Sequence, residues 1–370
     1  MHADRLRHLA RAHGPFASVY YDDSHNTEDA EAQLDIKRRT LRDSLAEQGA
    51  GDSLLDVFEK AMADSPPAVG RSGRALILGP EGVLIDEHLI RPPVSTVARV
   101  SELPYLVPLI EHGADSGSYV VVAVDHTGAD LEVHKGDAVE TTTIDGDGYP
   151  VHKAAGAETP GYGDPQPRAE EQAKRNLRAV AERVTALVEG ESADTVFVLG
   201  ETRSRVDFLA ELPERVSAAV VELHVGARNS GIDDGALQKA VDEELERRRL
   251  AVLGSTAARF EEGRGRDERL AVEGVSEVCA ALRDGNVDTL IIGDVGDAVV
   301  LADAQFTVVA PDAATLSELG AAPEKTVRAD EALPMSALAV SASVVRIDER
   351  IEPADGVAAL LRYSPPGGVH

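Results

Sequence analysis

The chain has 370 residues, no Trp, one Cys and a formal net charge of −28 at pH 7. So large an excess of acid argues against a general nucleic-acid-binding protein, which is normally basic, and one cysteine excludes a disulfide within the chain. No apolar run approaches the roughly 18 residues of a membrane span, and the N-terminus is charged where a signal peptide is apolar. We therefore expect a cytoplasmic protein with no membrane partner.

The first segment, residues 1–116, predicts an α/β domain. Apolar residues at helical spacing alternate here with short β-branched runs that end in Gly and Pro. In chain order we expect a helix at 4–12, the strand FASVYYD, helices over 32–45 and 53–63, and the strands GRALILG and VLIDEHLI. A dense basic run, Lys37, Arg38, Arg39 and Arg42, lies on the second of these helices.

The second segment, residues 117–262, follows the linker GADSGS. Three short strands separated by turns, YVVVAVD, DLEVHK and AVETTTI, predict an antiparallel meander. Helices then alternate with the strands TVFVLG and AAVVELHV, so we expect a mixed sheet flanked by helices. The long helix that begins at Asp233 ends near a second linker, EEGRGRDER.

The third segment, residues 263–370, predicts a small α/β sandwich. It starts with the expected helix LAVEGVSEVCAALRDG, and Cys279 within it reads as a packed core thiol. The remaining elements, in order, are the strands TLIIGD, AVVLAD and FTVVA, the helices ATLSEL and ADEALPMSALA, and the strands SVVRID and GVAALLRY.

One stretch stands out, between residues 152 and 167. It carries Gly156, Pro160, Gly161, Gly163, Pro165 and Pro167 and has no apolar pattern. Structureless loops longer than about 12–15 residues are uncommon in compact domains and are usually functional or disordered. An amphipathic helix follows directly, with Leu177, Val180 and Val184 at helical spacing.

Other motifs are weaker. The strand end LIIGDVGD lacks the glycine pattern of a nucleotide site, and the spacing of His2, His8 and His13 does not suit a metal. Asp22, Asp23 and His25 follow a strand end without a partner motif. We expect no catalytic residue, no metal site and no cofactor.

Taken together, the segments resemble the archaeal and eukaryotic-type peptide chain release factors and their relative Pelota. The resemblance is greatest to the bacterial branch of this family, which includes the ribosome hibernation factor Balon. The helix with Asp35-Ile36-Lys37-Arg38-Arg39 resembles the family's Asn-Ile-Lys-Ser segment, although only Ile36 and Lys37 fit. KAAGAETPGYGDPQPRAEEQAKRNLRAVAERV stands where the family carries Gly-Gly-Gln and its long helix.

The resemblance implies three domains: an N-terminal α/β domain at 1–116 on the decoding-centre side, an RNase H-like middle domain with a mixed sheet at 117–262, and an L30e-like α/β/α domain at 263–370. The middle domain's loop would face the peptidyl transferase centre. The C-terminal domain would meet a translational GTPase such as elongation factor Tu.

Departures from the family pattern indicate the function. Gly-Gly-Gln is absent, and the nearby Gln166 lies between two prolines, so we expect it to be extended and unable to replace the catalytic motif. We interpret the protein as a hibernation factor that occupies the A site of idle 70S ribosomes without hydrolysing peptidyl-tRNA. The residues expected to contact rRNA are Lys153, Gly156, Gly161, Tyr162, Gly163, Gln166 and Arg168 in the loop, with Lys37, Arg38, Arg39 and Arg42 in the N-terminal domain.

Two alternatives stay open. The first is a release or rescue factor that hydrolyses peptidyl-tRNA, with Gln166 in the catalytic role. The second is a Pelota-like adaptor that recruits a ribosome-splitting ATPase. The basic run Arg247–Arg249 is a further candidate for contact with RNA.

Overall fold

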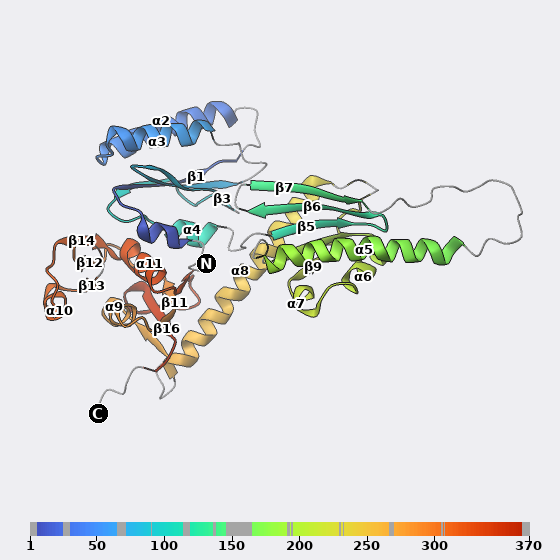
Figure 1. Cartoon of the computed structure of the whole chain (residues 1–370). Coiled ribbons are helices and arrows are strands. Elements are labelled where there is room, and N and C mark those ends of the chain that lie inside the picture. Colours follow the sequence, from blue (N-terminus) through green and yellow to red (C-terminus); the bar gives the residue numbers. More distant parts are fainter. Residues whose placement is uncertain are drawn as a thin grey trace, which may run out of the picture. The chain divides into compact units, whose positions relative to one another are not determined.

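The computed structural model groups the chain into two compact units (Figure 1). Unit 1 combines residues 1–115 with residues 248–370, and unit 2 comprises residues 116–247. The structure describes residues 6–24, 30–64, 72–89, 91–113, 119–135, 138–145, 165–190, 193, 195–228, 231, 233–265, 270–304, 306 and 308–364.

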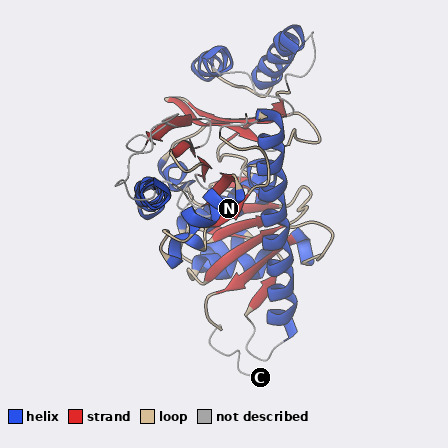
Figure 2. Cartoon of the chain, turned by 90° about the vertical axis from the view of Figure 1, so that its right-hand side faces the viewer, coloured by secondary structure: helices blue, strands red, loops and turns tan. Residues whose placement is uncertain are grey.

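The N-terminal part of unit 1 is an antiparallel sheet with strand order β3-β2-β1-β4. Two helices, α2 and α3, lie side by side and cover one face of it (Figures 1 and 2). The elements are η1 Arg7–Arg11, β1 Phe16–Asp22, α2 Ala30–Glu47, α3 Asp52–Asp64, β2 Gly73–Gly79, β3 Gly82–Leu89, β4 Val97–Ser101 and α4 Val107–His112.

The central strands of this sheet are buried on both faces. Side chains alternate across a strand, so Val19 and Leu76 point toward α2 and α3, while Tyr20 and Ile77 point the other way. A strand covered on both sides reads as a continuous apolar run, which is the pattern of GRALILG.

The C-terminal part of unit 1 contains a sheet with order β10-β16-β11-β15 and a smaller one with order β13-β12-β14. Leu253 and Phe260 of α8 pack on one face of the larger sheet, and α9 and α11 cover the other. The elements are α8 Asp234–Gly265, β10 Ala271–Glu273, α9 Val275–Arg283, β11 Val287–Ile292, β12 Val299–Ala302, β13 Val309–Ala310, α10 Ala313–Glu318, β14 Lys325–Arg328, α11 Ala329–Ala339, β15 Ser343–Arg346, η2 Ala354–Gly356 and β16 Val357–Leu361.

A single hydrophobic core joins the two parts of unit 1. It contains Tyr20 and Ile77 of the N-terminal sheet, Leu106 beside α4, and Leu290 and Leu338 of the C-terminal part, all of them buried. These two sequence-distant parts therefore share one apolar interior and form one body.

An arginine also joins the two parts. Arg99 on β4 reaches Asp330 and Glu331 at the start of α11, with Nη1 3.2 Å from Asp330 Oδ2 and 3.0 Å from Glu331 Oε1. Its guanidinium also stacks 3.6 Å from the ring centroid of Tyr105. Both carboxylates are buried and need a cation; Asp330 is also paired with Arg328 at 3.1 Å, whereas Glu331 pairs with Arg99. Even so, burial raises the pKa of Glu331, and the Arg99 guanidinium opposes that rise.

Unit 2 is built on a five-stranded mixed sheet with order β7-β6-β5-β8-β9. The strands β5, β6 and β7 are antiparallel, while β8 and β9 run parallel to β5. Leu177 and Val180 of α5 pack on one face, and Val241 of α8 is also buried. The elements are β5 Tyr119–Val124, β6 Gly128–Lys135, β7 Ala138–Asp145, α5 Pro165–Glu189, β8 Thr195–Gly200, α6 Thr202–Leu209, α7 Glu214–Ser217 and β9 Val220–Glu222, followed by the first part of α8.

The expected α/β class with several sheets is confirmed, as are the meander and the mixed sheet of the middle segment. The second linker is not where the sequence pattern places it. The helix α8 continues to Gly265 because Leu253 and Phe260 anchor it to the C-terminal sheet, and the units divide at 247/248. The expected helix from residue 270 is also partly wrong: residues 271–273 form β10, which pairs with β16. None of the described helices is long and apolar enough to cross a membrane.

Replacing Arg99 by alanine should destabilise unit 1 by about 3 kcal/mol, because the buried carboxylate of Glu331 loses the arginine that pairs with it, while Asp330 keeps Arg328. Hydrogen exchange of the β1 and β11 amides measures this loss. Arg259→Ala is the matched control: it removes an exposed pair with Asp288 and should cost less than about 1 kcal/mol. Equal effects of the two variants would contradict the role given to Arg99.

Candidate functional site

The segment predicted to be a long loop follows β7 in the chain, and β7 ends together with two other strands of the unit 2 sheet. Asp145 ends β7, and its register with Gly128 places it at the edge where β5 ends at Val124 and β8 ends at Gly200. Residues 146–164 lie outside the described part, and with them the expected RNA contacts Lys153, Gly156, Gly161, Tyr162 and Gly163. The structure therefore describes the strand before the predicted loop and the helix after it, and the contacts expected of the loop itself stay predictions.

Gln166 and Arg168 belong to the first turn of α5, which begins at Pro165. The expectation that Gln166 is extended is therefore wrong. Proline needs no N–H partner in the first turn of a helix, so Pro165 and Pro167 are compatible with a helical start. The described part says nothing of the side chains of Gln166 and Arg168.

Arg228 links the ends of β5, β6 and β7, next to the point in the chain where the predicted loop begins. Its guanidinium lies 3.3 Å from Asp125, 2.9 Å from Asp130 and 3.0 Å from Asp145, so it joins three strand ends, and it is only 12% exposed. Hydrogen bonding to Arg228 lowers the pKa of Asp130, and the carboxylates raise the pKa of Arg228. Asp130 and Arg228 therefore stay charged near neutral pH.

The backbones of β5 and β8 also pack closely where these two strands end. Gly200 has φ +144°, and a Cβ atom there would lie 2.2 Å from the carbonyl oxygen of Val124. Only glycine fits such a position, because it lacks a side chain and reaches positive φ without strain. Beyond Gly200, the guanidinium of Arg205 contacts Glu222 at 3.0 Å and the ring of His224 at 3.2 Å.

A pocket of about 530 Å³ lies between α5 and α6 near this edge. Its wall includes Glu170, Glu201, Asp207 and Glu211. The nearby cations are already paired, Arg203 with Glu170 and Lys174 with Glu211. This pocket is therefore unsuited to a phosphate group.

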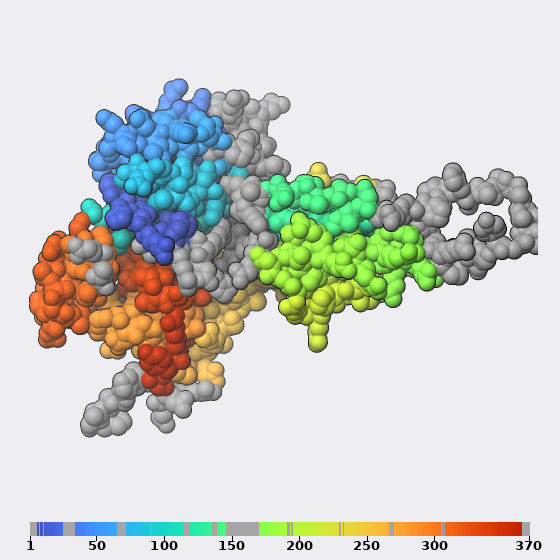
Figure 3. All heavy atoms as spheres, viewed as in Figure 1, coloured from blue at the N-terminus to red at the C-terminus, as the bar shows by residue number. Residues whose placement is uncertain are grey.

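The basic run of the N-terminal part lies on an exposed face formed by α2 and α3, drawn in blue in Figure 3. Arg38 and Arg42 both pair with Glu59 of α3, and Lys37 donates a hydrogen bond to the carbonyl of Asp22. Arg39 is exposed and makes no ion pair among the described residues. Only this member of the run presents an uncommitted guanidinium.

The remaining motifs have structural roles where the structure describes them. Cys279 is buried, and burial raises its pKa to about 12, so its thiol is packed as expected. After β11, Asp294 accepts a hydrogen bond from the Gly296 amide in a turn, as expected of a strand end. Asp23 is buried near Arg74, whereas His2 and His25 lie outside the described residues. In the described part, no group of three or more His, Cys, Asp or Glu side chains could hold a metal ion.

Sequence reasoning missed Arg99 and Arg228, the two arginines that organise the units. No local sequence pattern marks either arginine, because their partners are far away in the chain. Asp330 is 231 positions from Arg99, and Asp125 is 103 positions from Arg228. It also missed Glu59, which would only be suspected by placing α3 beside α2.

Comparison with known proteins defines the class. The model of the bacterial archaeo-eukaryotic release factor family 2 matches residues 118–266, which include the sheet, the loop and α5. Two uncharacterized proteins of Mycobacterium tuberculosis, from strains H37Rv and CDC 1551, are each 50% identical over 364 residues, covering 98% of this chain and 97% of theirs. The chain belongs to the bacterial archaeo-eukaryotic release factor family.

Three archaeal proteins are among the solved structures to which the chain is similar. The translation termination factor aRF1 is 16% identical, with a TM-score of 0.26 over 98% of this chain and 97% of that one. A ribosome-bound archaeal Pelota, in a model with ABCE1, is 17% identical, with a TM-score of 0.42 over 98% and 94%. Pelota of Archaeoglobus fulgidus is 16% identical, with a TM-score of 0.35 over 99% and 93%.

The Arg228 cluster should make unit 2 acid-sensitive. Because the folded-state pKa of Asp130 lies below its unfolded value, its stabilisation is present above about pH 4 and is lost as pH falls through the folded pKa. Urea unfolding followed by hydrogen exchange of β6, repeated between about pH 3 and pH 7, should show this loss. Arg228→Gln should flatten the pH dependence, whereas Arg203→Gln, which removes exposed pairs, should not. An unchanged slope in Arg228→Gln would contradict the assignment.

Proposed function

We propose that this protein binds the A site of idle 70S ribosomes and protects them during hibernation, without hydrolysing peptidyl-tRNA. The observation that carries the proposal is the sequence of residues 152–167, which has the Gly- and Pro-rich composition of a long loop but no Gly-Gly-Gln. The chain belongs to a release-factor family, and this segment lies between β7 and α5 in the chain. A protein that keeps the loop without the catalytic tripeptide is suited to occupying the site.

The charge of the chain supports a selective contact. At −28, most of the surface repels phosphate, so bulk affinity for RNA is low and binding depends on a few placed groups. In the N-terminal part, Arg38 and Arg42 share an ion pair with Glu59, whereas Arg39 makes none among the described residues, so we expect Arg39 to be the first of them to contact rRNA. The C-terminal part would contact a translational GTPase such as elongation factor Tu.

The helical start of α5 bears on the rival function of peptidyl-tRNA hydrolysis. A residue in the first turn of a helix has its backbone fixed by that helix, and Gln166 directly follows Pro165 instead of a glycine. The backbone freedom that the Gly-Gly-Gln chemistry requires is therefore missing at this position. We accordingly propose a non-enzymatic role.

The ion pairs of Glu59 give a test in which two variants act in opposite directions. Arg39→Ala should weaken ribosome binding about tenfold, because one charge-assisted contact is lost. Glu59→Gln should strengthen binding severalfold, because it releases Arg38 and Arg42 while removing only surface pairs. Co-sedimentation with idle ribosomes measures both.

Arg283→Ala is the control, because Arg283 is an exposed arginine of α9 far along the chain from this run. It should leave binding unchanged. If Arg39→Ala and Glu59→Gln both bind like the wild type, the RNA contact of the N-terminal part lies elsewhere.

The loop is tested by two further variants. Deleting residues 157–164 should abolish binding to idle ribosomes while hydrogen exchange of the unit 2 sheet stays unchanged, because the loop lies outside the described strands and helices. Replacing the same residues by an equal number of Gly and Ser should also weaken binding if Tyr162 and the neighbouring side chains contact rRNA. Gln166→Ala should have little effect.

Release of labelled peptide from loaded ribosomes separates the alternatives. The hibernation proposal expects no release by the wild type. Release that disappears in Gln166→Ala would establish a hydrolase instead, and subunit splitting that depends on an added ATPase would establish a Pelota-like adaptor.

A further inference from the structure

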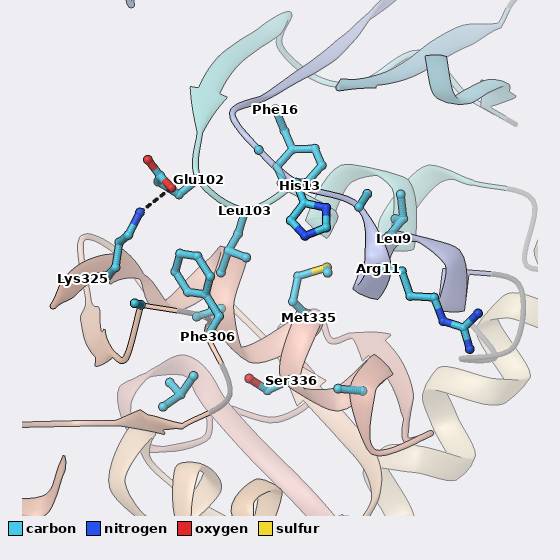
Figure 4. Close-up of a pocket in the computed structure, with 16 residues that line it drawn as sticks. Leu9, Arg11, His13, Phe16, Glu102, Leu103, Phe306, Lys325, Met335 and Ser336 are labelled. Atoms are coloured by element: carbon cyan, nitrogen blue, oxygen red, sulfur yellow. Dashed lines mark hydrogen bonds and ion pairs between the residues drawn. The ribbon is translucent and has the colours of Figure 1, made fainter. Parts of the chain in front are cut away.

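A second pocket lies within unit 1, where the chain between η1 and β1 meets the C-terminal part (Figure 4). Its volume is about 500 Å³, within the range of roughly 300–1,000 Å³ that is typical of small-molecule sites. None of its lining residues belongs to the basic run of α2.

The inner wall of the pocket is apolar and rigid. Leu9, Phe16 and Leu103 from the N-terminal part and Ala332 and Met335 from α11 are all buried. Because both parts of unit 1 contribute to this wall and share one core, the pocket is preformed by the fold.

One aromatic side chain in the pocket is held in a costly backbone conformation. Phe306 has φ +57°, in the left-handed region that phenylalanine rarely adopts, and its ring lines the pocket. The ammonium of Lys325 lies 5.5 Å from the centroid of that ring. Strained residues of this kind concentrate at ligand sites, where the surrounding structure maintains them for a purpose.

The polar groups at the rim favour an anion. On one side, Lys325 pairs with Glu102 at 2.7 Å, so that these two charges offset each other (Figure 4). On the other side, Arg11 is exposed and makes no ion pair among the described residues. The rim therefore carries a net positive charge in a strongly acidic chain, and His13 adds a polar ring between the two sides.

We propose that this pocket binds a small amphipathic anion, with an apolar or aromatic body against Phe306 and Met335 and an acidic group at Arg11. The apolar wall supplies affinity through burial, and the uncommitted guanidinium supplies selection for charge. A carboxylate, sulfonate or phosphate on an aromatic body fits this description.

The test uses 8-anilinonaphthalene-1-sulfonate, which has an aromatic body and one anionic group, and N-phenyl-1-naphthylamine, which is the same body without the charge. The full-length wild-type chain should bind one equivalent of each, measured by fluorescence titration. Arg11→Ala should weaken binding of the sulfonate roughly tenfold and leave binding of the neutral analogue unchanged. Arg39→Ala, which removes an equally exposed arginine outside the pocket, should change neither.

A filling variant locates the binding. Ser336 lines the pocket on α11, so Ser336→Trp should block both dyes, and the new side chain would be the only tryptophan of the chain and would report directly on the pocket. Ala339→Phe provides a second filling variant if Ser336→Trp unfolds, as judged by circular dichroism. Absence of stoichiometric binding to the wild type, or binding that both filling variants leave intact, would overturn the proposal.

Discussion

The architecture depends on the apolar core shared by the two ends of the chain. The N-terminal sheet buries Val19 and Leu76 against α2 and α3, and the core on its other face includes residues that follow more than 200 positions later. Leu290 and Leu338 belong to the same core as Tyr20 and Ile77, together with Leu9 and Leu109 of the N-terminal part. Burial of this area is what makes unit 1 one body.

Many charged side chains also find their partners within the protein. Arg99 pairs with carboxylates inside unit 1, Arg228 pairs with carboxylates at the strand ends of unit 2, and Glu59 pairs with two arginines on the surface. The acidic chain thus commits many of its arginines to its own fold, and the few that are uncommitted stand out. Arg39 and Arg11 are two of these, one on an exposed helix face and one at the rim of a pocket.

The sequence predicts the class of fold well because most elements carry their own local pattern. The continuous apolar run of GRALILG and the alternation in the meander are signals of that kind. The strands β4 and β10 were not predicted, because Val97–Ser101 and Ala271–Glu273 are short and are stabilised by pairing with β1 and β16. The helical start of α5 was not predicted. A residue before proline favours extended backbone, but proline is also well tolerated in the first turn of a helix, and here the helix forms.

The site was only partly accessible to sequence reasoning. The composition of residues 152–167 predicts a loop. The ion-pair cluster around Arg228 could not be predicted, because Arg228 lies outside any motif and its acceptors come from the ends of β5, β6 and β7. Similarly, a basic run looks uniform in the sequence, and only the position of Glu59 on α3 distinguishes Arg39 from Arg38 and Arg42. Ion pairing between elements is a property of the folded chain.

The discontinuity of unit 1 has a consequence for synthesis of the protein. Residues 116–247 form a compact unit of their own and are translated while the first 115 residues still lack their partner. The part of the shared core that β11, α11 and β16 supply is therefore missing until those elements have been synthesised. During that interval the nascent N-terminal part has apolar side chains that lack their final partners, and such surface favours aggregation.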